Sequence, residues 1–351
     1  MAAGERIPVN VITGFLGSGK TTLLQRLLRS PSLQNTAVLV NELGEIGLDH
    51  HLLQNAVTPT LLLENGCLCC AIRGDLKEAL RDLFDRRERG AIPAFTRVII
   101  ETSGLADPAP IAYTVLAEPV LQHHFRLGSV ITVVDAVNGL EQLAKFEESV
   151  KQVAVADRLV LTKTDLAHAD QLTQLRKRLI ELNLSAPIVD TALELPDPGD
   201  LIIQDIHDAA GKALEAGRWV VAARETALDH RHTSDVTSFA LVFDQPMDWT
   251  AFGVWMTMLL NRYGDKVLRI KGILNVAGVP TPVLINGVQH IVHPPVHLPA
   301  WPDADQRSRL VFIVHGLERE RIAVSLAAFN RLANPTASTV TPTAKAVENA
   351  G

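Results

Sequence analysis

The sequence predicts an α/β fold, in which a doubly wound, mostly parallel sheet is followed by a smaller α/β domain. Two observations support this prediction. From Pro8 to about His207, apolar and β-branched runs alternate with helical patterns, which is typical of parallel sheets flanked by helices. Runs such as Val98–Ile100 and Val130–Val134 contain almost no polar residue, as expected of strands that are buried on both faces.

The elements of the first domain follow one another in a regular order. The expected strands are Val9–Thr13, Ala37–Asn41, Arg97–Glu101, Ser129–Asp135, Arg158–Thr162 and Pro187–Asp190. The expected helices are Thr21–Arg29, Asp75–Arg89, Asn138–Val150 and Ala169–Leu182. We place this domain at residues 6–222 and a linker at 223–235, because the alternation is lost in that stretch.

The second domain is expected at residues 236–332. Its strands are predicted at Ser238–Phe243, Val267–Val276, Val283–Val292 and Leu310–Val314, and its helices at Asp248–Arg262 and Glu318–Arg331. In the first helix one apolar stripe is predicted to pack on the sheet, with a docking surface as the alternative; it consists of Phe252, Trp255, Met256, Leu259 and Tyr263. The strand that starts at Val267 alternates, with Leu268, Ile270, Leu274 and Val276 on one side and Arg269, Lys271 and Asn275 on the other. Residues 334–351 have no apolar face and are expected to be a disordered tail.

The composition restricts the class of partner. The chain has 351 residues, 33 Lys+Arg and 39 Asp+Glu, and its net charge of −6 makes nucleic acid or an anionic membrane a poor default partner. The N-terminus lacks the pattern of a secretory signal. The longest stretch without a charged residue, Gly272–Pro302, is interrupted by prolines and cannot span a bilayer. We therefore expect a soluble, cytoplasmic protein.

A phosphate-binding loop is the clearest motif. Residues Gly14–Thr21 fit the pattern G-x-x-x-x-G-K-[ST] and lie between a predicted strand and a predicted helix. The glycines permit a tight turn whose N–H groups surround a phosphate at the N-terminus of the helix. Lys20 is expected to contact the β- and γ-phosphate oxygens, and Thr21 to give its hydroxyl to Mg²⁺.

An acid for the metal and a sensor for the γ-phosphate are expected near the end of another strand. Glu101 ends a buried strand and is our preferred Mg²⁺ ligand, and the N–H of Gly104 can face the γ-phosphate. Asp135 is a second candidate acid. The alternative for Glu101 is that it only caps the helix that starts near Pro108.

The segment Thr162–Asp165 predicts guanine as the base. The carboxylate of Asp165 can accept from both N1–H and the 2-amino group of guanine, while the stem of Lys163 lies over the ring. Adenine offers no such pair of donors, so two charge-assisted hydrogen bonds favour GTP. The alternative is a cap for the helix after Ala167.

All three cysteines fall in one window, at Cys67, Cys69 and Cys70. Zn²⁺ and similar ions prefer thiolates, and an incomplete set of ligands suits a site that releases its metal. Cys67 and Cys69 share a face of an extended segment and are the primary candidate ligands, whereas Cys70 points elsewhere unless the backbone turns. A redox pair and buried, inert cysteines are the alternatives.

The segment Asn41–His51 is placed where a nucleotide-sensing switch would follow the second strand. Its carboxylates, Glu45 among them, and its imidazoles could reach Mg²⁺ or the cysteine-bound metal. A looser set of histidines is a weaker candidate for metal handling; it consists of His230, His232, His290, His293 and His297.

Together these motifs resemble the CobW-type GTPases, a family of cobalt and zinc metallochaperones. The matching segments are Gly14–Thr22, Asn41–Glu45, Glu64–Cys70, Glu101–Pro108, Thr162–Asp165 and, in the second domain, Arg269–Leu274. The resemblance implies a P-loop GTPase domain whose nucleotide-binding residues are Gly14, Gly17, Ser18, Gly19, Lys20, Thr21, Thr22, Thr162, Lys163 and Asp165. It also implies that GTP hydrolysis controls metal delivery from a thiolate site for Zn²⁺ or Co²⁺. The chain departs from the pattern at Thr162, where many GTPases carry Asn, and in the linker, where some members carry a long histidine run.

The predicted function is that of a Mg²⁺-dependent GTPase that binds a transition metal at the cysteines and delivers it to a client protein. Lys20, Glu101 and Gly104 are the predicted catalytic residues. The motifs contain no glutamine that would orient the attacking water, so slow intrinsic turnover is expected. A small-molecule P-loop kinase and a GTP-switched binding module without metal delivery are the alternatives. The sequence leaves open whether the chain forms a homodimer.

Overall fold

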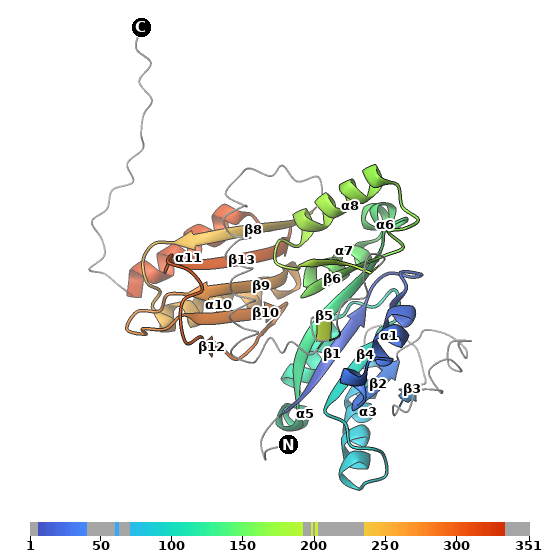
Figure 1. Ribbon diagram of the computed structural model, residues 1–351. Coiled ribbons are helices and arrows are strands. Elements are labelled where there is room, and N and C mark those ends of the chain that lie inside the picture. Colours follow the sequence, from blue (N-terminus) through green and yellow to red (C-terminus); the bar gives the residue numbers. More distant parts are fainter. Residues whose placement is uncertain are drawn as a thin grey trace.

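The computed structural model describes residues 6–40, 60–62, 71–191, 198, 201–202 and 235–333 (Figure 1). Its N-terminal part is a seven-stranded sheet in the order β3-β2-β4-β1-β5-β6-β7, and all its strand pairs are parallel. The strands are β1 (Ile7–Thr13), β2 (Thr36–Val40), β3 (Thr60–Leu62), β4 (Arg97–Glu101), β5 (Phe125–Asp135), β6 (Arg158–Thr162) and β7 (Ile188–Asp190). The predicted doubly wound α/β fold is thereby confirmed.

Helices cover both faces of this sheet (Figure 1). They are α1 (Lys20–Leu28), α3 (Ala71–Glu88), α4 (Ala109–Ala117), α5 (Pro119–His124), α6 (Gly139–Lys145), α7 (Glu147–Val155) and α8 (Ala169–Leu182), with a 3₁₀ turn η1 (Pro31–Leu33). Side chains of α3, α4 and α5 share one hydrophobic cluster with the sheet, and side chains of α1 share another. Alternate residues of each strand therefore face different helices, which explains the continuously apolar runs.

The single helix predicted at Asn138–Val150 is two helices. Phe146, between α6 and α7, has extended backbone angles, φ −125° and ψ 116°. Its ring packs against Phe15 of the phosphate-binding loop, with the ring centroids 4.6 Å apart. Because the helix breaks at Phe146, the aromatic ring of this residue contacts the phosphate-binding loop. A continuous helix would place the ring elsewhere.

The C-terminal part is an antiparallel sheet in the order β11-β10-β9-β13-β8, with β12 paired to β10. Its elements are β8 (Val236–Phe243), α10 (Trp249–Tyr263), η3 (Gly264–Lys266), β9 (Val267–Leu274), β10 (Val283–Val288), β11 (Ile291–Val292), β12 (Val296–His297), β13 (Ser308–His315) and α11 (Arg319–Ala333). The predicted stripe of α10 packs in the core together with β9, β13 and α11. The prediction that this stripe is core is confirmed.

The polar side of β9 is buried, which the alternating pattern did not predict. Arg269 and Lys271 are each 1% exposed because they pair with Asp157, which lies between α7 and β6. Nearby, Leu268 and Ile313 join the hydrophobic cluster of α7 and α8. The two sheets are therefore joined by both ionic and apolar contacts.

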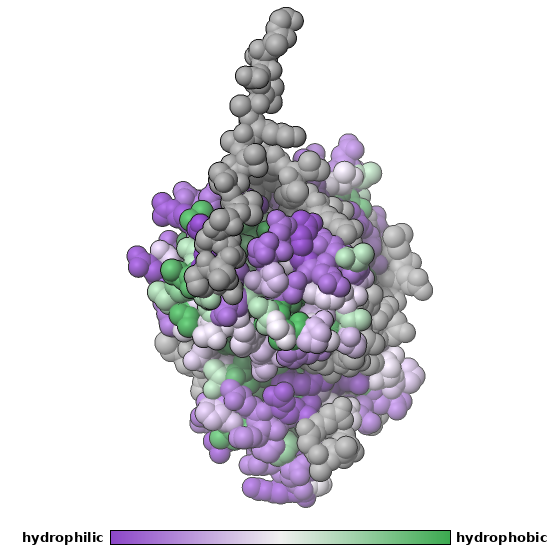
Figure 2. Space-filling view, turned by 90° about the vertical axis from the view of Figure 1, so that its left-hand side faces the viewer, coloured by the Kyte–Doolittle hydropathy of each residue, from purple (hydrophilic) through white to green (hydrophobic). Residues whose placement is uncertain are grey.

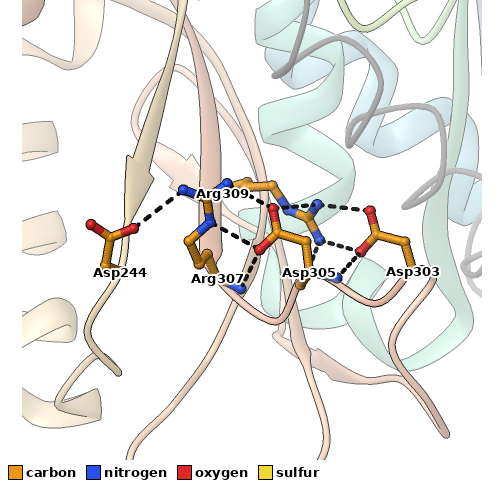
Figure 3. Close-up of polar contacts among 5 residues, drawn as sticks. All are labelled: Asp244, Asp303, Asp305, Arg307 and Arg309. Carbon is orange, nitrogen blue, oxygen red and sulfur yellow. Dashed lines mark hydrogen bonds and ion pairs between the residues drawn. The ribbon is translucent and has the colours of Figure 1, made fainter.

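A second ionic cluster lies at the start of β13 (Figure 3). Arg309 makes two 3.0 Å bonds to the carboxylate of Asp303, and Arg307 bonds to Asp305 at 2.9 Å and to Asp244 at 3.2 Å. Every carboxylate is already paired with a guanidinium, so the cluster fixes the loop and is not a cation site. On the face shown in Figure 2, hydrophilic residues predominate and hydrophobic ones lie in small separate groups.

The proposed limits of the domains stay predictions. Residues 223–234 of the predicted linker and the predicted tail, 334–351, lie outside the described residues. Among the helices of the described part, none has the length and apolar composition needed to cross a lipid bilayer.

Candidate functional site

The loop between β1 and α1 is tightly folded. Gly14 has φ +144°, and a Cβ atom there would lie 2.2 Å from the carbonyl oxygen of Val133, so only glycine fits. The N–H of Ser18 closes the turn on the carbonyl of Phe15 at 3.2 Å. The loop leads directly into α1, whose first N–H groups have no helical partner and are suited to bind an anion.

Lys20 folds back over this loop. Its ammonium group donates to the carbonyls of Gly14 at 2.9 Å and Phe15 at 3.2 Å, and the side chain is 9% exposed. The cation is thus held at the loop, where phosphate oxygens of a nucleotide would be bound. Thr22, one residue beyond the motif, is exposed on the first turn of α1.

Glu101 lies next to Thr21. The two strands β1 and β4 are neighbours, with Ile12 opposite Glu101, and this register brings the end of β4 to the start of α1. The hydroxyl of Thr21 donates to Oε1 of Glu101 at 2.5 Å. A hydroxyl and a carboxylate oxygen at one point form a donor set that suits Mg²⁺, a cation that prefers hard oxygen ligands.

The segment that follows β4 lies against the phosphate-binding loop. A Cβ atom on Gly104 would lie 2.7 Å from the backbone nitrogen of Leu16, so a larger residue would push the two segments apart. Thr102 connects the same segment to β1, since its hydroxyl donates to that of Thr13 at 2.8 Å. Gly104 therefore lies directly against the phosphate-binding loop.

The residues predicted to read the base are attached to the phosphate-binding loop. The hydroxyl of Thr162 donates to the carbonyl of Ser18 at 2.7 Å, and Lys163 donates to the carbonyl of Gly17 at 2.8 Å. Lys163 has φ +57°, a conformation that non-glycine residues rarely adopt. Asp165 is exposed on the outer side of this turn. Thr162, which departs from the family pattern, thus still holds together the two segments that are predicted to bind the nucleotide.

Asp135, the second candidate acid, has a different role. Its carboxylate pairs with Lys163 at 2.7 Å and accepts from Asn138 at 2.9 Å. Burial raises the pKa of Asp135, but the hydrogen bonds from Lys163 and Asn138 and from the N–H groups of Val137 and Asn138 outweigh it and lower the pKa. The buried carboxylate is therefore charged and holds Lys163, which leaves Glu101 as the better-placed metal ligand.

The turn predicted to read the base has a further contact that the sequence alone did not indicate. The hydroxyl of Thr164 donates to Asp190 at 2.6 Å, and Arg176 of α8 pairs with the other oxygen of that carboxylate at 2.9 Å. Asp190 is the last residue of β7, which pairs with β6. A polar residue at the end of a predicted strand is the sequence feature that could have indicated this contact.

The predicted transition-metal ligands cannot be placed. Cys67, Cys69, Cys70, Glu45 and the segment Asn41–His51 lie outside the described residues, as do His230 and His232. Within the described ranges, no three His, Cys, Asp or Glu side chains come together in a way that could hold a metal ion. His290 instead contacts Asp265 at 2.9 Å and the carbonyl of Leu260 at 3.2 Å.

Two protein families match the chain. Residues 8–190 match the family described as CobW/HypB/UreG, nucleotide-binding domain. Residues 236–330 match the cobalamin synthesis protein cobW C-terminal domain.

Curated relatives and solved structures agree with these matches. The chain is 35% identical to the zinc chaperone YjiA of Escherichia coli over 93% of its own length and 99% of the relative. It is 28% identical to the zinc-regulated GTPase metalloprotein activator 1 of Schizosaccharomyces pombe, covering 77% of this chain and 72% of that protein. The crystal structure of Zn(II)-bound YjiA GTPase from Escherichia coli superposes with a TM-score of 0.68 at 30% identity, over 93% of this chain and 99% of that one.

Proposed function

The chain belongs to the CobW/HypB/UreG family of nucleotide-binding proteins, and from this premise we propose that it is a Mg²⁺-dependent GTPase that binds zinc and delivers it to a client protein. The observation that carries the nucleotide part is the contact of Thr21 with Glu101 at 2.5 Å, which brings a hydroxyl and a carboxylate together at the N-terminus of α1. A kinase and a switch without metal delivery are less well supported, because the relatives are named for zinc and GTP.

The proposed roles follow from the positions of the side chains. Lys20 holds the β- and γ-phosphate oxygens in place of the carbonyls it now contacts. Thr21 and Glu101 would hold Mg²⁺, and the bound ion would neutralise charge on the phosphate oxygens. The N–H of Gly104 faces the γ-phosphate and makes a contact that is lost when that phosphate leaves.

Guanine selection is assigned to Asp165. The turn that carries it is held by contacts of Thr162 with Ser18, of Lys163 with Gly17 and Asp135, and of Thr164 with Asp190. A rigid turn keeps an exposed carboxylate at a fixed distance from the phosphate-binding loop. Recognition of both guanine donors by that carboxylate then adds about 1.5–3 kcal/mol for each charge-assisted hydrogen bond.

Zinc is the cargo rather than a resident cofactor. We assign it to Cys67 and Cys69, with Cys70 and Glu45 as further ligands, because Zn²⁺ and similar ions prefer thiolates and the three cysteines form one cluster in the sequence. Relatives named zinc chaperones and a Zn(II)-bound homologous structure support zinc over cobalt. The proposed partners are GTP and a metal-requiring client in the cytoplasm, and the proposal accommodates either a monomer or a homodimer.

The test measures the coupling of the two sites. The affinity for a non-hydrolysable GTP analogue is determined with Mg²⁺, in the presence and absence of Zn²⁺. We expect Zn²⁺ to tighten the analogue by roughly 5- to 150-fold, the usual range for coupled sites, and the analogue to tighten Zn²⁺ by the same factor. The double variant Cys67→Ser/Cys69→Ser is the control and is expected to lose this effect while it still binds the analogue. Equal affinity with and without Zn²⁺ in the unmodified chain would contradict metal delivery.

A further inference from the structure

Gln152 of α7 contacts the segment assigned to the γ-phosphate. Its side chain is 1% exposed, and its Nε2 donates to the carbonyl of Gly104 at 3.1 Å and to that of Ala106 at 3.0 Å. The main-chain carbonyl of Gln152 accepts from the hydroxyl of Thr132 in β5 at 2.6 Å, which ties this point of α7 to the sheet. A primary amide has two N–H donors, which is why one side chain holds two carbonyls of the same turn.

The segment is confined from both sides. On one side Gly104 lies so close to the loop that a Cβ would be 2.7 Å from the nitrogen of Leu16, and on the other side Gln152 holds the carbonyls. The turn is closed by the N–H of Ala106, which donates to Ser103 at 3.2 Å. Fixing the carbonyl of Gly104 fixes the peptide plane that follows this residue and so limits the backbone rotation at Gly104, whose own N–H lies in the peptide just before it.

The C-terminal end of α7, within about one turn of Gln152, is attached to the C-terminal sheet. Asp157, two residues after the helix, pairs with Lys271 of β9 at 2.9 Å and with Arg269, and it accepts from the N–H of Val130 at 3.0 Å. The side chain of Asn183 donates to three carbonyls around the end of α7, those of Val153, Ala154 and Ala156. The helix α7 therefore contacts the γ-phosphate segment through Gln152, and the chain just after the helix contacts the second domain through Asp157.

We propose that Gln152 is a positioning residue that preorganises the turn of Gly104 for the γ-phosphate and, through α7 and Asp157, couples this turn to the C-terminal sheet. The proposal rests on the proposed binding of GTP at the loop, and it is independent of zinc. It gives the C-terminal domain a direct mechanical connection to the nucleotide site through contacts that are buried, except for the partly buried bond of Gln152 to Ala106.

The first test uses Gln152→Met, which keeps the length of the side chain and removes both donors. Affinities for GDP and for a non-hydrolysable GTP analogue are measured with Mg²⁺ and a zinc chelator. Preorganisation affects only the nucleotide that has a γ-phosphate, so the ratio of analogue affinity to GDP affinity should fall about 10-fold, within the range for two lost hydrogen bonds. Gln171→Met is the matched control, because Gln171 also donates to a loop carbonyl, that of Val137, and should leave the ratio unchanged.

The second test is a double-mutant cycle across α7. Lys271→Met should lower the same ratio at least about 5-fold, and it should have less than about a 2-fold effect when Gln152→Met is already present. Arg307→Met, in the exposed ionic cluster of Figure 3, removes a cation of the C-terminal domain away from α7 and should not change the ratio.

A measurement on the unmodified chain does not depend on the folding of any variant. Amide hydrogen exchange in β9 should slow when GDP is replaced by the analogue. The inference is overturned if Gln152→Met weakens both nucleotides equally or neither of them, if the effects of the two substitutions add, or if exchange in β9 is the same with both nucleotides. Because zinc is absent throughout, failure of metal delivery would leave these readouts in place.

Discussion

The hydroxyl of Thr21 donates to the carboxylate of Glu101 at 2.5 Å, although the two residues are 80 positions apart in the chain. The contact exists because β4 pairs directly with β1 and ends where the phosphate-binding loop leads into α1. Both oxygens are suited to Mg²⁺, so Thr21 and Glu101 would hold the cation when it is bound, with the hydroxyl keeping its proton and turning it away from the carboxylate. The proposed role of Glu101 as a Mg²⁺ ligand can therefore be tested by substitution.

We expect Glu101→Gln to remove the dependence of nucleotide affinity on Mg²⁺. The amide keeps the shape of the side chain but provides no negative charge, so Mg²⁺ affinity and turnover should each fall at least roughly 10-fold. The measurement is a titration of nucleotide affinity against Mg²⁺ concentration. Glu118→Gln is the control. Glu118 forms an ion pair of 2.6 Å with Lys77 of α3 and has no contact with Thr21 or Glu101. An unchanged Mg²⁺ dependence in Glu101→Gln would show that another group holds the ion.

Lys20→Ala is expected to abolish nucleotide binding or turnover. The ammonium group contacts the carbonyls of Gly14 and Phe15 and is the cation that the motif places at the phosphate oxygens. Loss of charge-assisted hydrogen bonds at ~1.5–3 kcal/mol each should reduce turnover by 10²-fold or more at subsaturating GTP. Phosphate release is measured in the variant and in Lys145→Ala, an exposed lysine of α6. A rate equal to that of the unmodified chain would refute the assignment.

The sequence predicted the parallel sheet because its strands are buried on both faces and contain almost no polar residue, as at Val98–Ile100. It predicted the phosphate-binding loop because the glycine spacing is demanded by backbone geometry, as at Gly14, where a Cβ atom has no room. Both predictions depend on properties of residues that are close together in the sequence.

Other features depend on partners that are distant in the sequence. The alternating pattern in β9 predicted that Arg269 lies on the face opposite its apolar neighbours. It could not show that this polar face contacts Asp157, a carboxylate 112 residues earlier in the chain, and not water. Both β4 and β5 end in an acid that could hold the metal, and the choice between Glu101 and Asp135 rests on the side chain of Lys163, which pairs with Asp135. The break at Phe146 likewise depends on its contact with the ring of Phe15.

Asp165→Asn should change the preferred base. The amide offers one acceptor and one donor, so it mismatches guanine and suits the extra carbonyl of xanthine. Loss of two charge-assisted hydrogen bonds predicts a fall in GTP affinity of roughly 10²- to 10⁴-fold, with a gain for xanthosine triphosphate. Competition binding measures both. The matched control is Asp170→Asn, an exposed aspartate in the first turn of α8. Unchanged preference for GTP over ATP in Asp165→Asn would mean that guanine is read elsewhere.

Asp157→Asn should destabilise the chain in a pH-dependent manner. Burial raises the pKa of Asp157, but the charges of Arg269 and Lys271 and a hydrogen bond from the N–H of Val130 outweigh it and hold the pKa well below the ordinary value of 3.8. Removal of the anion leaves two cations buried at 1% exposure, a change that typically costs about 3–5 kcal/mol. Urea unfolding at pH 7, followed by a probe in the C-terminal sheet, measures this loss.

The sign of the pH dependence follows from the lowered pKa. A carboxyl group whose pKa is lower in the folded state than in the unfolded state stabilises the fold fully above the unfolded value, and this contribution is lost as the pH falls through and below 3.8. The difference in unfolding free energy between the unmodified chain and Asp157→Asn should therefore be constant from pH 7 to about pH 5 and shrink towards pH 3. Asp170→Asn should show no such difference at any pH. A gap that stays constant down to pH 3 would mean that Asp157 contributes through its shape and hydrogen bonds alone, without its charge.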